Sequence, residues 1–265
     1  MKYVITGSEG FIGKAVLEAL KLRGDYVWQI HQDKNLYNDD TALEGMIEQC
    51  DGIFHIGAIS DTTEHDPNYM LYWNYTTSKI LFDLARKYDK KVVYSSSAAN
   101  YGSGDGIPNN IYGWSKLLAE EYGMKACERF VALRYFNVYG PGESDKGKMA
   151  SVAYQAHKAG KFKLFPGDIK RDFVYVPDVV HANLHAMTLE RGVFDVGTGT
   201  AETFESLVEG MEISYTYHDK NMIPKWYQYF TKADRSKFMP GWKPYWNVLK
   251  GTEDYRETLG TMWEG

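Results

Sequence analysis

Short apolar runs alternate with amphipathic segments along the first half of the chain. The runs are rich in β-branched and aromatic residues, as buried strands are, and the longer segments repeat their apolar positions at helical spacing. Strands are predicted at residues 2–6, 26–30, 53–58, 91–97 and 129–136. Helices are predicted from the glycine-rich turn to about residue 23, and at residues 41–50, 67–88 and 112–126. This alternation predicts an α/β fold, a doubly wound parallel sheet with helices on both faces.

The pattern changes after Gly140-Pro141-Gly142. A charged loop is predicted at residues 143–148, then a helix at 149–157 and a short strand at 173–176. A helix at 178–190 and a strand at 193–196 predict a return to the main sheet, and the Tyr- and Trp-rich remainder predicts a smaller C-terminal lobe. We therefore expect a main domain of residues 1–140 and 177–198, and a substrate lobe of residues 141–176 and 199–265.

Composition narrows the class of protein. The 265 residues are 44% hydrophobic and 25% charged, which is ordinary for a globular protein. The net charge of −5 provides no basic footprint for nucleic acid and no polybasic membrane patch. No apolar run approaches the ~20 residues that span a bilayer, and the N-terminus reads as a strand and turn rather than a signal peptide. Cys50 and Cys127 follow no metal or redox spacing, so we expect reduced, buried thiols of a cytosolic protein.

A glycine triplet, Gly7, Gly10 and Gly13, lies between the first strand and the first helix. Glycines at such a turn let the backbone approach a pyrophosphate and let the helix pack closely on the strand. The N-terminus of the helix then offers free N–H groups and the positive end of its dipole to the phosphates. A glycine-rich turn without a ligand is the alternative, but the strand–turn–helix context favours a dinucleotide site.

The end of the second strand bears on the choice between NAD and NADP. An acid there accepts hydrogen bonds from the ribose 2′-hydroxyl, whereas a 2′-phosphate requires its absence and a nearby cation. Here the strand ends in His31 and Gln32, with Lys34 close behind and Asp33 between them. This arrangement favours NADP, with NAD as the alternative.

A second motif places Tyr112 and Lys116 on one face of a predicted helix, downstream of Ser97 at the end of a strand. Tyrosine, with a pKa of about 10, is a poor base at neutral pH. A lysine ammonium beside it stabilises the phenolate and lowers that pKa, so Tyr112 can take the proton of a substrate hydroxyl as its carbon loses hydride. Ser97 would hydrogen-bond the same oxygen. A Tyr/Lys pair at this spacing usually lies on the protein surface without a catalytic role. Here its position downstream of the glycine turn and of Ser97 favours catalysis.

Two other patterns have simpler interpretations. His181 and His185 lie one helical turn apart, which can suit a metal, but Ala182 stands where H-E-x-x-H has its glutamate, so we expect no metal site. The aromatic residues of the C-terminal part are interpreted as lobe core rather than a platform for stacking bases.

Taken together, the glycine turn, Ser97, the Tyr112/Lys116 pair and the sequence Arg-Tyr-Phe-Asn at 134–137 resemble the extended short-chain dehydrogenase/reductases that act on nucleotide sugars. More narrowly, residues 62–64, 134–141, 146–152 and 170–176 resemble the ADP-glyceromanno-heptose 6-epimerases, and 227–234 does so more weakly. The resemblance implies a Rossmann core, a tightly held NADP and a smaller C-terminal lobe that grips the nucleotide diphosphate.

The resemblance also implies roles for individual residues. For catalysis these are Ser97, Tyr112 and Lys116, with Lys146 as a second base. Without the family, Lys146 would be interpreted as a solvated loop lysine. For the cofactor they are Gly7, Gly10, Phe11, Ile12, Gly13, His31, Gln32, Lys34, Ala58, Asn74, Tyr112 and Lys116. For the substrate they are Ser60, Asn137, Ser151, Phe165, Arg171 and Tyr227, with Arg171 facing the phosphates, a role that suits its bidentate fork.

The expected activity is that of an isomerase, an NAD(P)-dependent nucleotide-sugar epimerase that oxidises a sugar hydroxyl transiently and returns the hydride. An NADPH-dependent reductase or a 4-epimerase is the alternative. A 4,6-dehydratase would place an acid just after Ser97, where Ala98 and Ala99 stand. A non-catalytic NADP-binding regulator commonly loses the Tyr or the Lys, and both are present. We also expect a cytoplasmic homo-oligomer.

Overall fold

The computed structural model describes residues 1–31, 40–104, 106–223 and 227–261, and the chain divides into two compact units. One, here called the sheet unit, comprises Met1–Tyr135 and Val180–Phe194; the other, the lobe unit, comprises Phe136–Val179 and Asp195–Gly265. The predicted division has the same order of segments, with boundaries a few residues away. No helix in the described ranges is long and apolar enough to cross a membrane.

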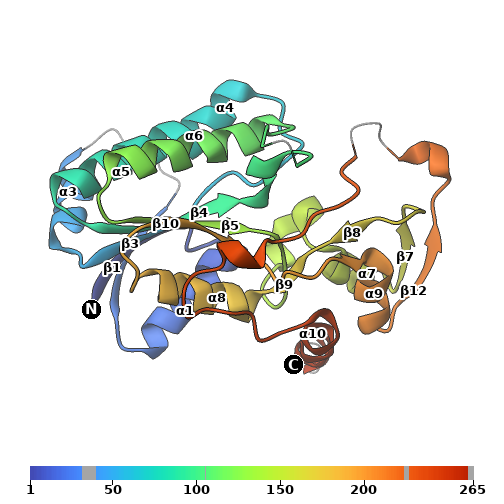
Figure 1. Cartoon of the computed structure of the whole chain (residues 1–265). Coiled ribbons are helices and arrows are strands. Elements are labelled where there is room, and N and C mark those ends of the chain that lie inside the picture. Colours follow the sequence, from blue (N-terminus) through green and yellow to red (C-terminus); the bar gives the residue numbers. More distant parts are fainter. Residues whose placement is uncertain (32–39, 105, 224–226, 262–265) are drawn as a thin grey trace. The chain divides into compact units, whose positions relative to one another are not determined.

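The sheet unit is built on a six-stranded sheet (Figure 1). Its strands are, in spatial order, β10 (Gly192–Val196), β5 (Phe130–Tyr135), β4 (Lys91–Ser97), β3 (Gly52–His55), β1 (Lys2–Thr6) and β2 (Tyr26–Ile30). The pairs from β2 through β1, β3 and β4 to β5 are parallel. Strands buried on both faces carry continuous apolar runs, as β4 does in Val92 and Val93. This architecture confirms the predicted α/β Rossmann-type sheet.

Helices cover both faces of this sheet (Figure 1), with α4, α5 and α6 on one face and α1 and α8 on the other. The helical segments are α1 (Phe11–Leu22), α3 (Asp40–Gln49), α4 (Pro67–Leu71), α5 (Thr77–Lys87), α6 (Ile111–Ala126), α8 (Val176–Ala186) and a short 3-10 turn, η2 (Ala98–Tyr101). The helix predicted over 67–88 is interrupted by a π-helical turn, η1 (Tyr72–Thr76). That wider turn contains Asn74, whose side chain bonds the backbone of Ile59.

The lobe unit contains three strand pairs. They are β6 (Asn137–Tyr139) with β9 (Phe173–Tyr175), β7 (Lys161–Leu164) with β12 (Ser214–Tyr217), and β8 (Lys170–Arg171) with β11 (Glu202–Thr203). Its helical segments are η3 (Ser144–Met149), α7 (Val152–Ala159), α9 (Phe204–Gly210), η4 (Lys220–Met222), η5 (Arg235–Lys237) and α10 (Val248–Thr261). Tyr139, Tyr175 and Tyr255 pack in its core. Of the C-terminal aromatic residues predicted to form lobe core, Trp242 is buried, whereas Tyr229 and Phe230 are exposed.

Two predictions about the start of this unit differ from the structure. The segment predicted as a charged loop forms η3, in which the Lys146 N–H donates to the Glu143 carbonyl at 3.1 Å. The helix predicted from residue 149 begins at Val152, because Ser151 caps it: its Oγ accepts from the Tyr154 N–H at 3.2 Å.

Candidate active site

The glycine turn between β1 and α1 is closed too tightly for side chains. Gly7 has a φ of +69°, and a Cβ there would lie 2.5 Å from the Cα of Gly57. A Cβ on Gly13 would lie 1.9 Å from the Gly7 carbonyl oxygen. Only glycine satisfies both the left-handed backbone and these close approaches. The structure therefore shows why Gly7 and Gly13 are glycines: the turn is tight and the helix packs closely against it, as the sequence predicted.

The same turn fits a dinucleotide pyrophosphate. Ser8 is only 3% exposed, yet its Oγ has no hydrogen-bond partner among the residues that the structure describes. Gly10, the N-cap of α1, supplies no side-chain cap to the first N–H groups of that helix. Buried hydroxyls without partners are rare in proteins, and uncapped N–H groups at a helix N-terminus attract anions. Ser8 was not singled out in the sequence, since a serine between glycines reads as an ordinary turn residue.

The adenosine side of the site is described in part. The His31 Nδ1 lies 3.4 Å from a carboxylate oxygen of Glu9, and both side chains are largely exposed. Gln32 and Lys34, predicted to contact the cofactor, lie outside the described residues. Glu9 thus places a carboxylate beside the end of β2, where sequence reasoning had found no acid. Ala58 and Ser60 are exposed on the segment after β3.

A buried chain of hydrogen bonds fixes the backbone under the glycine turn. The Ser78 hydroxyl donates to the Asn74 carbonyl at 2.7 Å, so it accepts from His55 Nε2, also at 2.7 Å. The other ring nitrogen, Nδ1, then accepts from the Thr6 hydroxyl at 2.8 Å, and the Thr6 Oγ1 accepts the Gly57 N–H at 2.9 Å. These bonds assign the Nε2–H tautomer. Burial, with the charge of nearby Lys116 as a smaller cause, lowers the pKa of His55 to about 3, so the ring is neutral.

Asn74 connects this region with the start of α6. Its amide oxygen accepts from the Ile59 N–H at 2.7 Å, and its amide nitrogen donates to the Ile59 carbonyl at 2.9 Å and to Ser115 Oγ at 3.0 Å. Ser115 Oγ in turn donates to the Tyr112 carbonyl at 2.7 Å. The amide therefore positions two backbone segments, and its predicted contact with the cofactor stays a prediction.

The structure brings Ser97 and Tyr112 together. Ser97 ends β4 and caps η2, where its Oγ accepts from the Ala99 N–H at 3.1 Å. A side-chain hydrogen bond from Ser97 lowers the pKa of Tyr112, while burial, the larger effect, raises it. Gly113 permits the approach of α6 to η2, since a Cβ there would lie 2.9 Å from the Ala99 carbonyl oxygen.

Lys116 lies one turn of α6 beyond Tyr112 and is 2% exposed. Its ammonium lies 4.4 Å from the centre of the Tyr94 ring, a distance that allows a cation–π interaction. Burial lowers the pKa of Lys116 to about 7, and the carboxylate of Glu120 opposes this shift. A buried ammonium beside a tyrosine favours the phenolate, so this part of the sheet unit is suited to taking a proton from a hydroxyl.

Arg171 is the main buried cation of the lobe unit, at 7% exposure. It donates to the carbonyls of Lys170 and Gln228, and its guanidinium lies 5.5 Å from the Tyr227 ring centre and 5.7 Å from that of Phe204. In the described part of the chain, no carboxylate pairs with it. Burial lowers the pKa of Arg171, yet arginine stays charged. The described neighbours of this guanidinium are backbone carbonyls and aromatic rings, which do not neutralise its charge. Such a charge can bind an anion.

The other predicted substrate residues of the lobe unit fall into two groups. Phe165 and Tyr227 pack edge to face with ring centres 5.3 Å apart, close to Arg171. Asn137 is exposed at the start of β6, and Ser151 donates to the buried carboxylate of Glu143 at 2.6 Å. Lys146 is half-buried, and burial lowers its pKa while Glu143 opposes the shift.

Sequence reasoning missed a buried acid next to Arg171. Asp172 accepts from the N–H groups of Thr198, Gly199 and Ala233 at 2.7–3.0 Å, and from the Thr198 hydroxyl at 2.8 Å. It thereby holds two loop segments, at residues 198–199 and 233, beside β8. The Lys-Arg-Asp-Phe stretch at 170–173 was the available signal. The predicted absence of a metal site stays a prediction; within the described ranges no group of His, Cys, Asp and Glu could hold an ion.

The model of the NAD dependent epimerase/dehydratase family matches residues 3–197. The chain belongs to this family. Its fold is also similar to solved structures of family enzymes over nearly the whole chain. The ADP-L-glycero-D-manno-heptose-6-epimerase of Helicobacter pylori is 28% identical with a TM-score of 0.85, covering 98% of this chain and 96% of that one.

Two 4-epimerases are similar to a comparable degree. The UDP-N-acetylglucosamine 4-epimerase of Methanobrevibacter ruminantium is 26% identical with a TM-score of 0.83, over 99% of this chain and 98% of that one. The UDP-glucose 4-epimerase of Thermotoga maritima is 25% identical with a TM-score of 0.82, over 99% and 100%. These similarities confirm the resemblance to extended short-chain dehydrogenase/reductases acting on nucleotide sugars. Family membership makes the protein an enzyme that uses a nicotinamide dinucleotide.

Proposed function

We propose that the protein interconverts two epimers of a nucleotide-diphosphate sugar, with an ADP-glyceromanno-heptose as the substrate. The observation that carries this proposal is the Ser97 side chain close enough to the Tyr112 phenol to lower its pKa, with the Lys116 ammonium buried one helical turn further on. The heptose is supported by the similarity of residues 146–152 and 170–176 to the heptose 6-epimerases, and by the likeness to the Helicobacter pylori enzyme.

The residues of the sheet unit would perform the proton transfer. When bound at the glycine turn, the cofactor supplies the hydride acceptor and donor. Tyr112 takes the hydroxyl proton of one epimer as its sugar carbon is oxidised, and returns a proton when the ketone is reduced back to that epimer. Ser97 holds the reacting oxygen by a hydrogen bond. Lys116 would stabilise the Tyr112 phenolate electrostatically and so oppose the burial that raises the pKa of the tyrosine.

The lobe unit would supply the grip on the nucleotide diphosphate. Arg171, charged and without a carboxylate partner in the described structure, is suited to the phosphates. Phe165 and Tyr227 offer an aromatic surface near the Arg171 charge, on which the nucleobase of the substrate could stack. We assign Lys146 as a second proton-transfer group, because epimers place their hydroxyl hydrogens in different directions and one tyrosine serves only one of them. Burial lowers the pKa of Lys146, which eases this exchange.

The alternatives within the family differ in the residues that they require after Ser97. A 4,6-dehydratase needs an acid that protonates the departing hydroxyl, and Ala98 and Ala99 of η2 offer none. A 4-epimerase on a UDP-hexose and an NADPH-dependent reductase both fit the same Ser97, Tyr112 and Lys116. They form the second candidate, supported by the likeness to two 4-epimerases.

The cofactor choice between NADP and NAD depends on the end of β2. His31 and Lys34 favour NADP in the sequence, but the carboxylate of Glu9 beside His31 would repel a 2′-phosphate and accept from a 2′-hydroxyl. We therefore assign NAD as the preferred cofactor, in agreement with the description of the family. A homo-oligomeric state and a cytoplasmic location remain part of the proposal.

The proposed activity can be tested with purified protein that has passed through gel filtration. Bound nucleotide is identified by mass spectrometry, and the protein is incubated with each epimer of the ADP-heptose and, in parallel, with UDP-glucose and UDP-galactose. We expect the heptose epimers to interconvert without added cofactor. Conversion of the UDP-hexoses alone would identify a 4-epimerase, and a net change in nicotinamide absorbance matching product would identify a reductase.

A further inference from the structure

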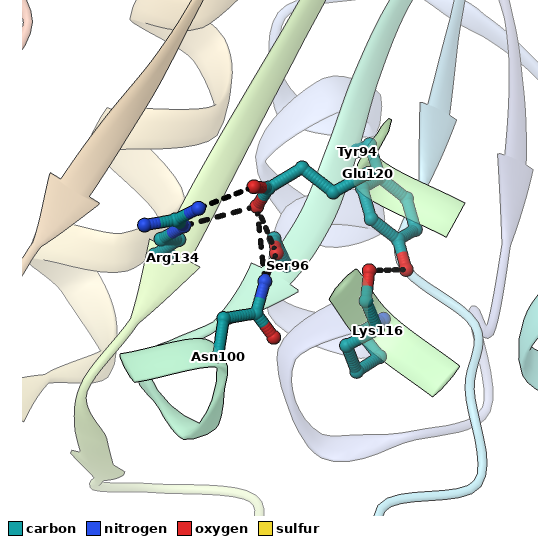
Figure 2. A network of polar contacts seen from close by, with 6 residues as sticks. All are labelled: Tyr94, Ser96, Asn100, Lys116, Glu120 and Arg134. Carbon is teal, nitrogen blue, oxygen red and sulfur yellow. Dashed lines mark hydrogen bonds and ion pairs between the residues drawn. The ribbon is translucent and has the colours of Figure 1, made fainter. Parts of the chain in front are cut away.

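A buried acid lies one helical turn beyond Lys116. Glu120, 1% exposed, accepts hydrogen bonds from three other elements (Figure 2). The donors are Ser96 Oγ of β4 at 2.5 Å, Asn100 Nδ2 of η2 at 3.2 Å, and Arg134 of β5 through Nε at 3.1 Å and Nη2 at 2.5 Å. We call Ser96, Asn100, Glu120 and Arg134 the Glu120 cluster.

The cluster surrounds the turn that carries Ser97. Ser96 directly precedes Ser97, and Asn100 belongs to the turn that Ser97 caps. Asn100 also donates to Ser96 Oγ at 3.0 Å, so both ends of the turn are tied to one carboxylate on α6. Tyr112 lies at the start of the same helix, so Glu120 connects the turn that carries Ser97 with the helix that carries Tyr112.

The cluster also contains a negatively charged group that acts on the Lys116 ammonium. The titratable groups that face Lys116 in the described structure are Tyr94 of β4, His55 of β3, and Tyr112 and Glu120 of its own helix. His55 is neutral, and burial raises the pKa of both tyrosines. Glu120 is the one carboxylate in this group, and it raises the pKa of Lys116. Its own counter-ion is Arg134, whose guanidinium is further held over the Tyr101 ring at 4.6 Å.

We propose that Glu120 is a positioning residue that holds the Ser97 turn against α6 and keeps the Lys116 ammonium charged beside Tyr112. The inference rests on the proposed function, because the charge matters only if Tyr112 acts as a base. An isolated glutamate one turn after a lysine is an ordinary helix-surface pair with a small effect. Here both side chains are buried, where charges interact far more strongly than at a surface.

Two substitutions in the cluster are expected to shift the pKa of Lys116 in opposite directions. Glu120→Gln removes the attracting charge, so Lys116 should lose its proton at lower pH, by about one pH unit. Arg134→Gln removes the competing cation and leaves the carboxylate facing Lys116, so the lysine should keep its proton to higher pH. If the cluster only stabilised the fold, the pKa of Lys116 would shift in the same direction in both variants, because each substitution breaks the same cluster.

The test is a pH titration of Lys116 by NMR in protein labelled with ¹³C-lysine, with its Cε resonance assigned by its disappearance in Lys116→Arg. This readout does not require the substrate, so it stands even if the proposed activity fails. Glu121→Gln, at the exposed neighbouring position of α6, removes the same charge and should leave the midpoint unchanged. The expected order of midpoints is Glu120→Gln below the parent and Arg134→Gln above it.

An unchanged midpoint in Glu120→Gln, or a shift of both variants in one direction, would overturn the proposal. If Glu120→Gln does not fold, Arg134→Gln still decides by the sign of its shift. Where the epimerase assay works, the alkaline limb of the kcat profile should move with the NMR midpoint in each variant, while KM changes little.

Discussion

The Ser97 side chain at the end of β4 acts on the Tyr112 phenol at the start of α6. Burial raises the pKa of Tyr112, and the Ser97 side chain opposes this shift. The tyrosine is therefore held in position before substrate arrives, and its conversion to a base depends on the charges added around it. Lys116 supplies the protein's share of that charge.

Replacing Tyr112 by Phe removes the proton acceptor and leaves the ring in place. We expect the variant to fold and to bind cofactor, with kcat lower by about 10²- to 10⁴-fold, the usual contribution of general-base catalysis. Tyr122→Phe is the matched control, because its hydroxyl lies on the same helix and bonds Asp83 at 2.7 Å. Steady-state kinetics on both variants checks this; near-parental turnover in Tyr112→Phe would rule out its role.

Calorimetric titration of stripped protein should give tighter binding of NAD⁺ than of NADP⁺. The Glu9 carboxylate next to His31 is the physical reason. Glu9→Gln should narrow the difference by about fivefold, corresponding to about 1 kcal/mol for a partly exposed charge. Glu18→Gln, at an exposed position of α1, serves as the control. Preference for NADP⁺ in the parent would instead favour the interpretation based on Lys34.

Lys146→Met should stop epimerisation and spare one half-reaction. If Lys146 exchanges the proton for one configuration only, the variant should still form reduced cofactor from the epimer that Tyr112 serves. The measurement is nicotinamide absorbance with each ADP-heptose epimer, alongside product analysis. Lys148→Met, an exposed neighbour in the same 3-10 segment, should epimerise normally. Equal epimerisation rates in Lys146→Met and the parent would show that Lys146 is a charged loop residue without a catalytic role.

His55 should make the folded state sensitive to acid. Its pKa is about 3 in the folded protein and about 6.5 in an unfolded chain, so the unfolded state binds more protons as the pH falls below 6.5. The stability gained from the neutral ring is full above that pH and is lost towards pH 3. Between pH 7 and pH 5 the loss is about 2 kcal/mol.

Urea unfolding at a series of pH values measures this dependence. His55→Gln should be less stable at pH 7 because it breaks the bonds to Thr6 and Ser78, but its stability should fall less steeply towards pH 5. The exposed His65→Gln is the control and should keep the slope of the parent. Identical slopes in His55→Gln and the parent would exclude His55 as the cause.

Much of the sheet unit could be predicted from the sequence. β1 and β2 have the predicted bounds, because each is a short run rich in β-branched and aromatic residues that is bounded by polar residues or glycine. Ser97, Tyr112 and Lys116 can be proposed from the sequence for a related reason: their spacing depends on one strand end and one helix face. The two-residue strands β8 and β11 were missed, since such short strands are defined by their partner rather than by their own pattern.

The supporting residues of the site were harder to predict. In sequence, Glu120 resembles any helix-surface glutamate, and only the folded chain reveals that Ser96 and Arg134 converge on it. Likewise His55 stands in an apolar strand with nothing to indicate partners on β1 and α5. Contacts between elements distant in sequence decide these roles, and local periodicity carries no information about them.

The central claim is transient oxidation of a sugar carbon with return of the same hydrogen. It is tested most directly with ADP-heptose carrying deuterium at C6, incubated with the enzyme in ordinary water and analysed by NMR and mass spectrometry. We expect an epimerised product that retains deuterium at C6 in the opposite configuration. Epimerised product that has exchanged its deuterium for solvent hydrogen would contradict it.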